Sequence, residues 1–335
     1  NLTNLTIPSN LNNNRFIDRR FAFFANLDLA FKDYLNFNAT GRYENTSKLL
    51  YSQKTNLEST PDYFYYSGGV SFMPLKAFNI ESNTLSRFVV KASHTQVGND
   101  PVGAFSIEQT VQLGTGYPFG TGPLSFVNNG SPTDTQIRPE IVRSEEASLG
   151  LGFFKNRLTL DVSAYIQNTS DLITNQATSS ASGIAFSPVN IGDIRNRGLE
   201  VTLGATPFRG TDFSWDFNLA WSINRTKVME LANGADEVNL STGGIAGIFA
   251  VKGMEFPMLK ATAYQRDDQG RIIINPENGN PEFTNNYVNF GRVTPNYTMM
   301  FNTNFKYKNF GLYAVLDYRN GGKIYSGAMQ SMAFS

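Results

Sequence analysis

The chain has 335 residues, with 28 basic and 28 acidic side chains, one histidine and no cysteine. A net charge near zero argues against nucleic acid as the main partner, because phosphate binding requires an excess of basic residues. The lack of cysteine excludes a disulfide framework and thiolate metal sites, and one histidine cannot form a multi-histidine zinc site.

An alternation of apolar and polar residues runs through the chain and predicts β-strands. Aromatic residues at 13% and charged residues at only 17% fit a strand-rich composition. In "FSWDFNLAWS", Phe213, Trp215 and Phe217 share one face, whereas Ser214 and Asp216 share the other. We predict about ten strands, over residues 21–31, 35–45, 63–73, 85–96, 145–154, 157–168, 197–207, 212–226, 296–307 and 310–319.

The connections between the predicted strands alternate strictly between short and long. The short ones cover residues 32–34, 74–84, 155–156, 208–211 and 308–309. The long ones are rich in Gly, Asn, Ser, Thr and Pro, and cover residues 46–62, 97–144, 169–196 and 227–295. Short periplasmic turns and long extracellular loops are typical of bacterial outer-membrane barrels.

Two architectures share this alternation. In a soluble β-sandwich the apolar face forms the core, whereas in a membrane barrel it meets lipid and the polar face lines the lumen. Strand lengths near the roughly 9–11 residues that cross a bilayer, together with the loop asymmetry, favour the barrel. Aromatic residues at the strand ends also favour it, as in interfacial girdles: Phe31, Tyr34, Tyr43, Phe213, Trp221, Tyr307 and Tyr318.

We therefore predict an all-β fold, a segment of a transmembrane antiparallel β-barrel in an outer membrane. Ten strands that did not close would leave bare amides and carbonyls in hydrocarbon, at a cost of several kcal/mol each. Either these strands close alone or further polypeptide completes the barrel. Because the last residues lead away from a strand into what should be another long loop, we expect residues 1–335 to be part of one larger barrel domain.

A family resemblance rests on the segment "NIGDIRNRGLEVTLGATPFRGTDFSWDFNLAWSINRTKVMEL". It resembles the SusC/RagA family of TonB-dependent outer-membrane transporters of the Bacteroidetes type. That family has a loop that closes on N-x-G-x-x-x-N-x-G-x-E, followed by an F-x-W strand. The matching residues here are Asn190, Gly192, Asn196, Gly198, Glu200, Phe213, Trp215, Asn224, Lys227, Val228 and Leu231. The similarity is strong over 138–325 and weaker but collinear over 20–100.

The resemblance implies a 22-stranded barrel with an N-terminal plug domain, a TonB-contacting segment and a SusD-like surface lipoprotein as a lid. Family substrates are glycans or peptides. We expect the plug, the TonB-contacting segment and the closing strands to lie outside residues 1–335. The expected partners are therefore the SusD-like lipoprotein, TonB through the absent plug, membrane lipid and a glycan or peptide, but not nucleic acid.

Candidate site residues follow from the predicted faces. On the polar faces, the residues expected to line the lumen are Asp161, Glu200, Asp216, Asn218, Asn302, Asn304 and Lys306. Aromatic residues of the outer loops could stack on sugar rings, pack against a lid or hold the loops together: Tyr63, Phe64, Tyr117, Phe119, Phe249 and Tyr264.

Charged clusters raise the question of catalysis or metal binding. Asp193, Arg195, Arg197 and Glu200 could be acid/base machinery, but no supporting partner is identifiable, so we interpret them as a lumen-side junction that anchors a long loop. Residues 266–283 are rich in oxygen ligands, yet lack the order of a calcium loop. A structural cation or a solvated hairpin remains open there, and no other cofactor or metal is expected.

The sequence thus predicts a transporter and no enzyme: TonB-dependent uptake of glycans or peptides as the barrel component of a SusCD-like complex. One alternative is a SusC-like barrel that serves as a structural subunit of a larger outer-membrane assembly. Another is a soluble secreted β-sandwich that binds glycans.

Overall fold

Ten strands form one antiparallel sheet in which each strand pairs with its neighbours along the chain. The structure is a computed structural model that describes residues 17–50, 60–104, 106–107, 111–113, 126–128, 137–177, 186–241 and 244–332. In spatial order the strands are β1 (Arg20–Phe31), β2 (Leu35–Thr46), β3 (Asp62–Phe72), β4 (Leu85–Asn99), β7 (Glu140–Phe153), β8 (Leu158–Ser170), β11 (Gly192–Arg209), β12 (Phe213–Leu231), β17 (Tyr297–Tyr307) and β18 (Phe310–Asn320).

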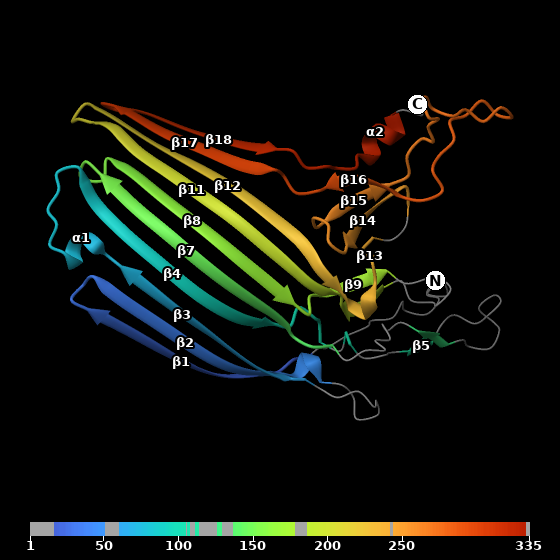
Figure 1. Cartoon of the computed structure of the whole chain (residues 1–335), viewed down its shortest axis with the longest axis horizontal. Helices are drawn as coiled ribbons and strands as arrows, with labels where there is room; N and C mark the ends of the chain where they lie inside the picture. The colour runs from blue at the N-terminus through green and yellow to red at the C-terminus, as the bar shows by residue number, and fades with distance from the viewer. Residues whose placement is uncertain are drawn as a thin grey trace, which may run out of the picture.

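All ten predicted strands and the alternation of their connections are confirmed. The short connections gather at one end of the sheet, on the left in Figure 1, and we call this the turn end. Left-handed residues such as Lys32 and Lys308 make the tight reversals there. Helix α1 (Pro74–Ala77) lies in the connection between β3 and β4. The long connections gather at the opposite end, which we call the outer end.

The strands extend further toward the outer end than the sequence predicts. β11 begins at Gly192 rather than at residue 197, and β12 ends at Leu231 rather than at residue 226. In this extension the clean apolar alternation is lost, because Arg195 and Arg197 occupy the face that carries Leu199 nearer the turn end. The backbone pairing continues beyond the apolar band, so a prediction based on hydrophobic period stops too early.

Small sheets that were not predicted cover the outer end. Four strands make one of them: β13 (Glu237–Asn239), β14 (Ala246–Val251), β15 (Met258–Ala261) and β16 (Val288–Arg292). Two hairpins are formed by β9 (Ile173–Ala177) with β10 (Phe186–Asn190), and by β5 (Val111–Leu113) with β6 (Phe126–Asn128). Helix α2 (Gly327–Met332) follows β18. No helix among the described residues is long and apolar enough to cross a membrane.

The buried apolar residues of the described part lie mainly in these outer-end segments. One cluster joins the end of β12 to the small sheet through Val228, Leu231, Val238 and Ala250. A second cluster contains Leu49, Val102, Ile107 and Ile137. The outer loops are therefore packed structures with cores of their own.

The apolar face of the ten-stranded sheet, by contrast, is bare. Large side chains on it stay exposed, including Phe23 and Leu316, both at 64%. In a soluble sandwich a second sheet would bury this face. The sandwich alternative is therefore wrong for the described part of the chain, since its other sheets are the small ones at the outer end.

Candidate functional site

The opposite face of the sheet, which we call the polar face, carries all seven residues that were predicted to line a lumen. The pairing register shows this directly, because residues opposite each other in an antiparallel pair point to the same side. Asp216 lies opposite Asn304, and Asn218 lies opposite Asn302. Asp161, Glu200 and Lys306 occupy the same face by the two-residue period of their strands. That this face lines a lumen stays a prediction.

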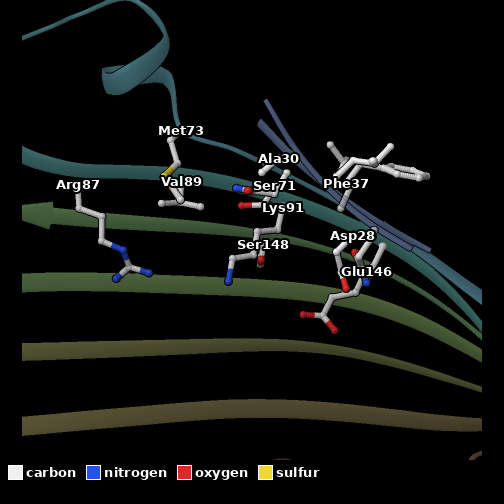
Figure 2. A pocket seen from close by; sticks show the side chains of 17 residues that line it. Asp28, Ala30, Phe37, Ser71, Met73, Arg87, Val89, Lys91, Glu146 and Ser148 are labelled. Atoms are coloured by element: carbon white, nitrogen blue, oxygen red, sulfur yellow. The ribbon is translucent and has the colours of Figure 1, made fainter. Parts of the chain in front are cut away.

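A groove of about 640 Å³ runs over β1, β2, β3, β4 and β7. Figure 2 shows Asp28, Arg87, Lys91 and Glu146 extending from the polar face, whereas Phe37 is directed away. The basic side chains Arg87 and Lys91 thus lie toward the turn end of the groove, and the acidic side chains Asp28 and Glu146 lie together further along it. A solute with hydroxyl, amide or charged groups would find both donors and acceptors here.

The predicted residue Asp161 borders this groove through an ion pair. Arg87 Nη2 lies 3.0 Å from Asp161 Oδ1, and both side chains are more than a third exposed. The two pack above Gly150, where a Cβ atom would stand 2.7 Å from Arg87 Nη2. Glycine at position 150 therefore leaves the space in which the pair lies across the polar face of β7.

A second groove of about 280 Å³ brings four of the predicted residues together. Asp216, Asn218, Asn302 and Asn304 line it, near the turn end. Asp216 accepts a hydrogen bond of 2.6 Å from the Thr206 hydroxyl, which fixes one carboxylate oxygen. The amide side chains of the three asparagines supply both donors and acceptors to this groove.

A charged network at the outer end of β1–β4 was missed by the sequence analysis. Glu44 is only 1% exposed, and its carboxylate lies 2.5 Å from Arg20 and 2.9 Å from Arg42. The hydroxyls of Tyr63 and Tyr65 each donate to it at 2.9 Å. Four donor groups thus satisfy one buried carboxylate, as burial of a charge requires.

The same network ties the sheet to a loop. Arg20 also pairs with Asp100 at 2.5 Å, and the Thr46 hydroxyl donates to Asp100 at 2.7 Å. Asp100 is 3% exposed and directly follows β4. Nearby, Glu140 accepts hydrogen bonds from Asn99 and from the backbone N–H of Ile173. These groups hold the starts of the long loops against the sheet.

The segment that carries the family resemblance has a structural explanation. Asn190 accepts from the N–H of Arg138 and donates to the carbonyls of Arg138 and Asp171, which joins three outer-end segments. Gly192 has φ +131°, in the region that favours glycine, and a Cβ there would meet the carbonyl oxygen of Glu230 at 2.1 Å. The long loop is thus anchored by Asn190, and of the charged residues that we interpreted as the anchor, Asp193 accepts a hydrogen bond from the N–H of Asp171.

Gly198 in this segment provides room for an aromatic ring. It lies directly opposite Tyr165, and a Cβ at position 198 would stand 2.2 Å from the ring. The interpretation of a lumen-side charge cluster, however, is wrong for two of its members. Arg195 and Arg197 share the apolar face with Leu199 and do not share the polar face of Glu200.

Of the six candidate loop aromatics, Tyr63 and Phe64 lie in β3 and not in a loop. Tyr63 is buried against Glu44, whereas Phe64 is exposed on the apolar face and stacks on Tyr66. Phe249 is buried in β14, where it contacts Tyr287. Both buried rings hold the fold together and do not offer a face to a ligand.

Tyr264 is 44% exposed and contacts Phe283 at 5.0 Å between ring centroids. Tyr117 and Phe119 lie outside the described residues. Among the described members of the predicted set, Tyr264 is therefore exposed in an outer loop and Phe64 is exposed on the apolar face of β3.

The oxygen-rich segment 266–283 folds into a projecting hairpin arrangement. Asp267 accepts from the N–H groups of Gln269 and Arg271 and from the Arg271 side chain. The backbone and side chain of Arg271 hold the pKa of Asp267 below its usual value. Among the described residues, no three His, Asp or Glu side chains gather in a metal-holding arrangement.

Comparison with known proteins gives a consistent result. The sequence model of the family described as "TonB dependent receptor-like, beta-barrel" matches residues 1–331. TonB-dependent receptor P3 of Formosa agariphila is 25% identical over 313 residues, which is 84% of this chain and 31% of that protein. TonB-dependent receptor SusC of Bacteroides thetaiotaomicron is 29% identical over 129 residues, or 36% of this chain and 12% of SusC.

Among solved structures, the RagAB peptide transporter has a chain that is similar with a TM-score of 0.73 and 20% identity. The similarity covers 90% of this chain and 33% of that one. At this identity the likeness concerns the fold. The chain spans about a third of the length of the relatives that it matches over most of its own length.

Proposed function

Because the chain belongs to the TonB-dependent receptor-like β-barrel family, we propose that it forms part of the wall of a SusC-like importer of glycans or peptides. The family and its relatives are transporters or receptors of outer membranes and are not enzymes. The proposal that the chain forms part of an importer wall rests on one observation: a single continuous sheet with a polar, grooved face and a bare apolar face. In a barrel, the first face borders the substrate path and the second meets lipid.

The two edges of the sheet support a larger barrel. In the described part of the chain, β1 and β18 each pair with one neighbour only and do not pair with each other. Their free N–H and C=O groups would each cost several kcal/mol in hydrocarbon. We propose that further strands pair with both edges, so that residues 1–335 are part of one barrel domain.

The proposed partners follow from the relatives. The named assembly of the similar structure is RagAB, and one relative is SusC. A SusD-like surface lipoprotein would cover the outer end, where the packed loop sheets lie, and TonB would act through a plug. The charges of the larger groove, including Asp28, Arg87 and Lys91, suit a polar solute such as an oligosaccharide or oligopeptide.

The test is uptake by cells that carry or lack the gene for this chain. Growth on a panel of oligosaccharides and oligopeptides as sole carbon source should fail for one class in the deletion strain and in a strain without TonB. A matched pair of variants then examines the path. Asn218→Trp places a bulky ring in the smaller groove and should slow uptake several-fold, whereas Leu219→Trp on the apolar face should not.

Unchanged uptake of every substrate in the deletion strain would refute the transport proposal. The structural-subunit alternative predicts that result, together with loss of another surface protein from the outer membrane. Equal uptake by both tryptophan variants, each folded, would mean that the polar face does not border the substrate path.

A further inference from the structure

A band of basic residues lies on the apolar side of the sheet, at the outer end. Its members are Arg143 on β7, Arg195 and Arg197 on β11, and Arg225 and Lys227 on β12, and we call them the rim patch. The register places Arg195 opposite Lys227 and Arg197 opposite Arg225. The rim patch is a local concentration of positive charge in a chain whose net charge is zero.

The rim patch begins where the apolar band ends. On the same face but nearer the turn end, the next residues of β11 are Leu199 and Val201. Ile223 and Trp221 of β12 lie opposite them. These side chains would contact acyl chains if the bare face meets lipid. The rim patch would then lie at the depth of the lipid head groups of the outer leaflet.

The charges of the rim patch are only partly compensated within the described residues. Arg143 donates to Gln96, and Arg195 donates to Asn168, both neutral amides. Glu255 is 3.7 Å from Arg225, but it is also held by Arg292 at 2.7 Å.

Two further observations concern the surroundings of these basic side chains. Like charges directly opposite each other destabilise an antiparallel pair, and two such pairs follow one another here. In the described part of the chain, Arg225 Nη1 is a buried nitrogen without a hydrogen-bond partner. An anion seated on the exposed basic side chains between β11 and β12 would relieve the repulsion between the two pairs.

We propose that the rim patch binds the phosphate group of a glycolipid in the outer leaflet. Arginine is suited to phosphate because its planar fork donates two parallel hydrogen bonds. A lipid is favoured over a soluble anion because its acyl chains would lie on Leu199, Val201 and their neighbours while the phosphate meets the arginines. This inference rests on the proposed assignment of the bare face to lipid.

The test uses the purified protein that contains this chain, in detergent micelles, with lipid A as the probe. Native mass spectrometry would compare phosphorylated lipid A with the same lipid after phosphatase treatment. Arg197→Gln/Lys227→Gln should weaken binding of the phosphorylated form about tenfold, as expected for lost charge-assisted hydrogen bonds. Both side chains are exposed, and neither makes a side-chain hydrogen bond or ion pair that holds the described fold together.

A matched control removes the same charge from the other end of the sheet. Lys155→Gln/Lys308→Gln lies at the turn end and should bind phosphorylated lipid A as the unaltered protein does. Raising the salt concentration should weaken binding through screening. Heat-modifiable mobility on a gel would show that all variants are folded.

Several outcomes would overturn the inference: equal binding of the dephosphorylated lipid, equal loss in the control variant, or complete competition by millimolar inorganic phosphate. The last result would indicate a site for free phosphate. The assignment of the apolar face to lipid is tested separately. Arginine substitutions at positions 202 and 203, on opposite faces, examine it without any lipid phosphate.

Discussion

The exposure of the two faces can be tested by one pair of neighbouring substitutions. Leu203 and Thr202 are adjacent on β11, so their side chains point to opposite faces. Leu203 lies between Leu160 and Leu219 on the apolar face. Thr202 lies opposite Asp161 on the polar face. An arginine at position 203 would enter lipid, whereas one at position 202 would meet a carboxylate and water.

The position of Leu203 within the apolar band determines how much stability Leu203→Arg should lose. Outward apolar residues of β12 run from Phe213 to Ile223, about ten residue steps, or about 26 Å of height at 3.4 Å per residue and 40° tilt. Leu219, the partner of Leu203, is about one step from the middle of this band. We therefore expect the midplane cost, about 2–4 kcal/mol, for Leu203→Arg and about 0–1 kcal/mol for Thr202→Arg.

The assay is reversible denaturant unfolding of the protein in phospholipid vesicles. The two tryptophans of the chain, Trp215 and Trp221, both lie on the apolar face of β12 and report its transfer from lipid to water. The free energy of unfolding should fall in Leu203→Arg and stay nearly unchanged in Thr202→Arg. Equal losses, or a larger loss for Thr202→Arg, would show that the faces have been assigned the wrong way.

Four further outcomes are expected. Gly198→Ala should destabilise the protein by about 1–3 kcal/mol, because the added carbon meets the Tyr165 ring, and adding Tyr165→Ala should recover part of this loss in a double-mutant cycle. Glu44→Gln removes the charge that Arg20 and Arg42 face and should cost about 1–3 kcal/mol, whereas Tyr65→Phe, which removes one of its donors, should cost less. Asn190→Ala should speed proteolysis of the outer loops without changing the unfolding midpoint of the barrel strands; a shifted midpoint would contradict a purely local anchor. Because the folded pKa of Asp267 is depressed, the stabilisation that Asp267 gives the hairpin is present above its unfolded pKa, near 4, and is lost as the pH falls through the folded pKa. Hydrogen exchange of the hairpin amides should therefore be slower than in Asp267→Ala at neutral pH, and this difference should vanish at low pH.

The apolar band of the ten-stranded sheet was predictable because one constraint acts on every strand there. In a membrane barrel a side chain that meets lipid must be apolar and its neighbour in sequence points to the opposite face, so the alternation marks the strand. Beyond the apolar band that constraint ends, although the backbone of β11 and β12 continues to pair. The short strands of the loop sheet, such as Glu237–Asn239, carry too few residues for any period to be read.

The site was predictable only as a face. Asp161 and Asp216 could be assigned to the polar side, but the sequence does not show which polar residues become buried together. Glu44 and Tyr63 meet because β2 and β3 pair in that register. A signal existed in the two-residue spacing of Arg42 with Glu44, which puts opposite charges on the same face of a strand.

The length of β12 has a consequence for whatever covers the outer end. The strand has 19 residues, which reach about 47 Å in height at 3.4 Å per residue and a 40° tilt, whereas the apolar band accounts for about 26 Å and begins at the turn end. If the apolar band spans the bilayer as proposed, the loop sheet stands about 20 Å above the lipid. A lid anchored by its own lipid tail would need a tether of at least about six extended residues to reach the loop sheet.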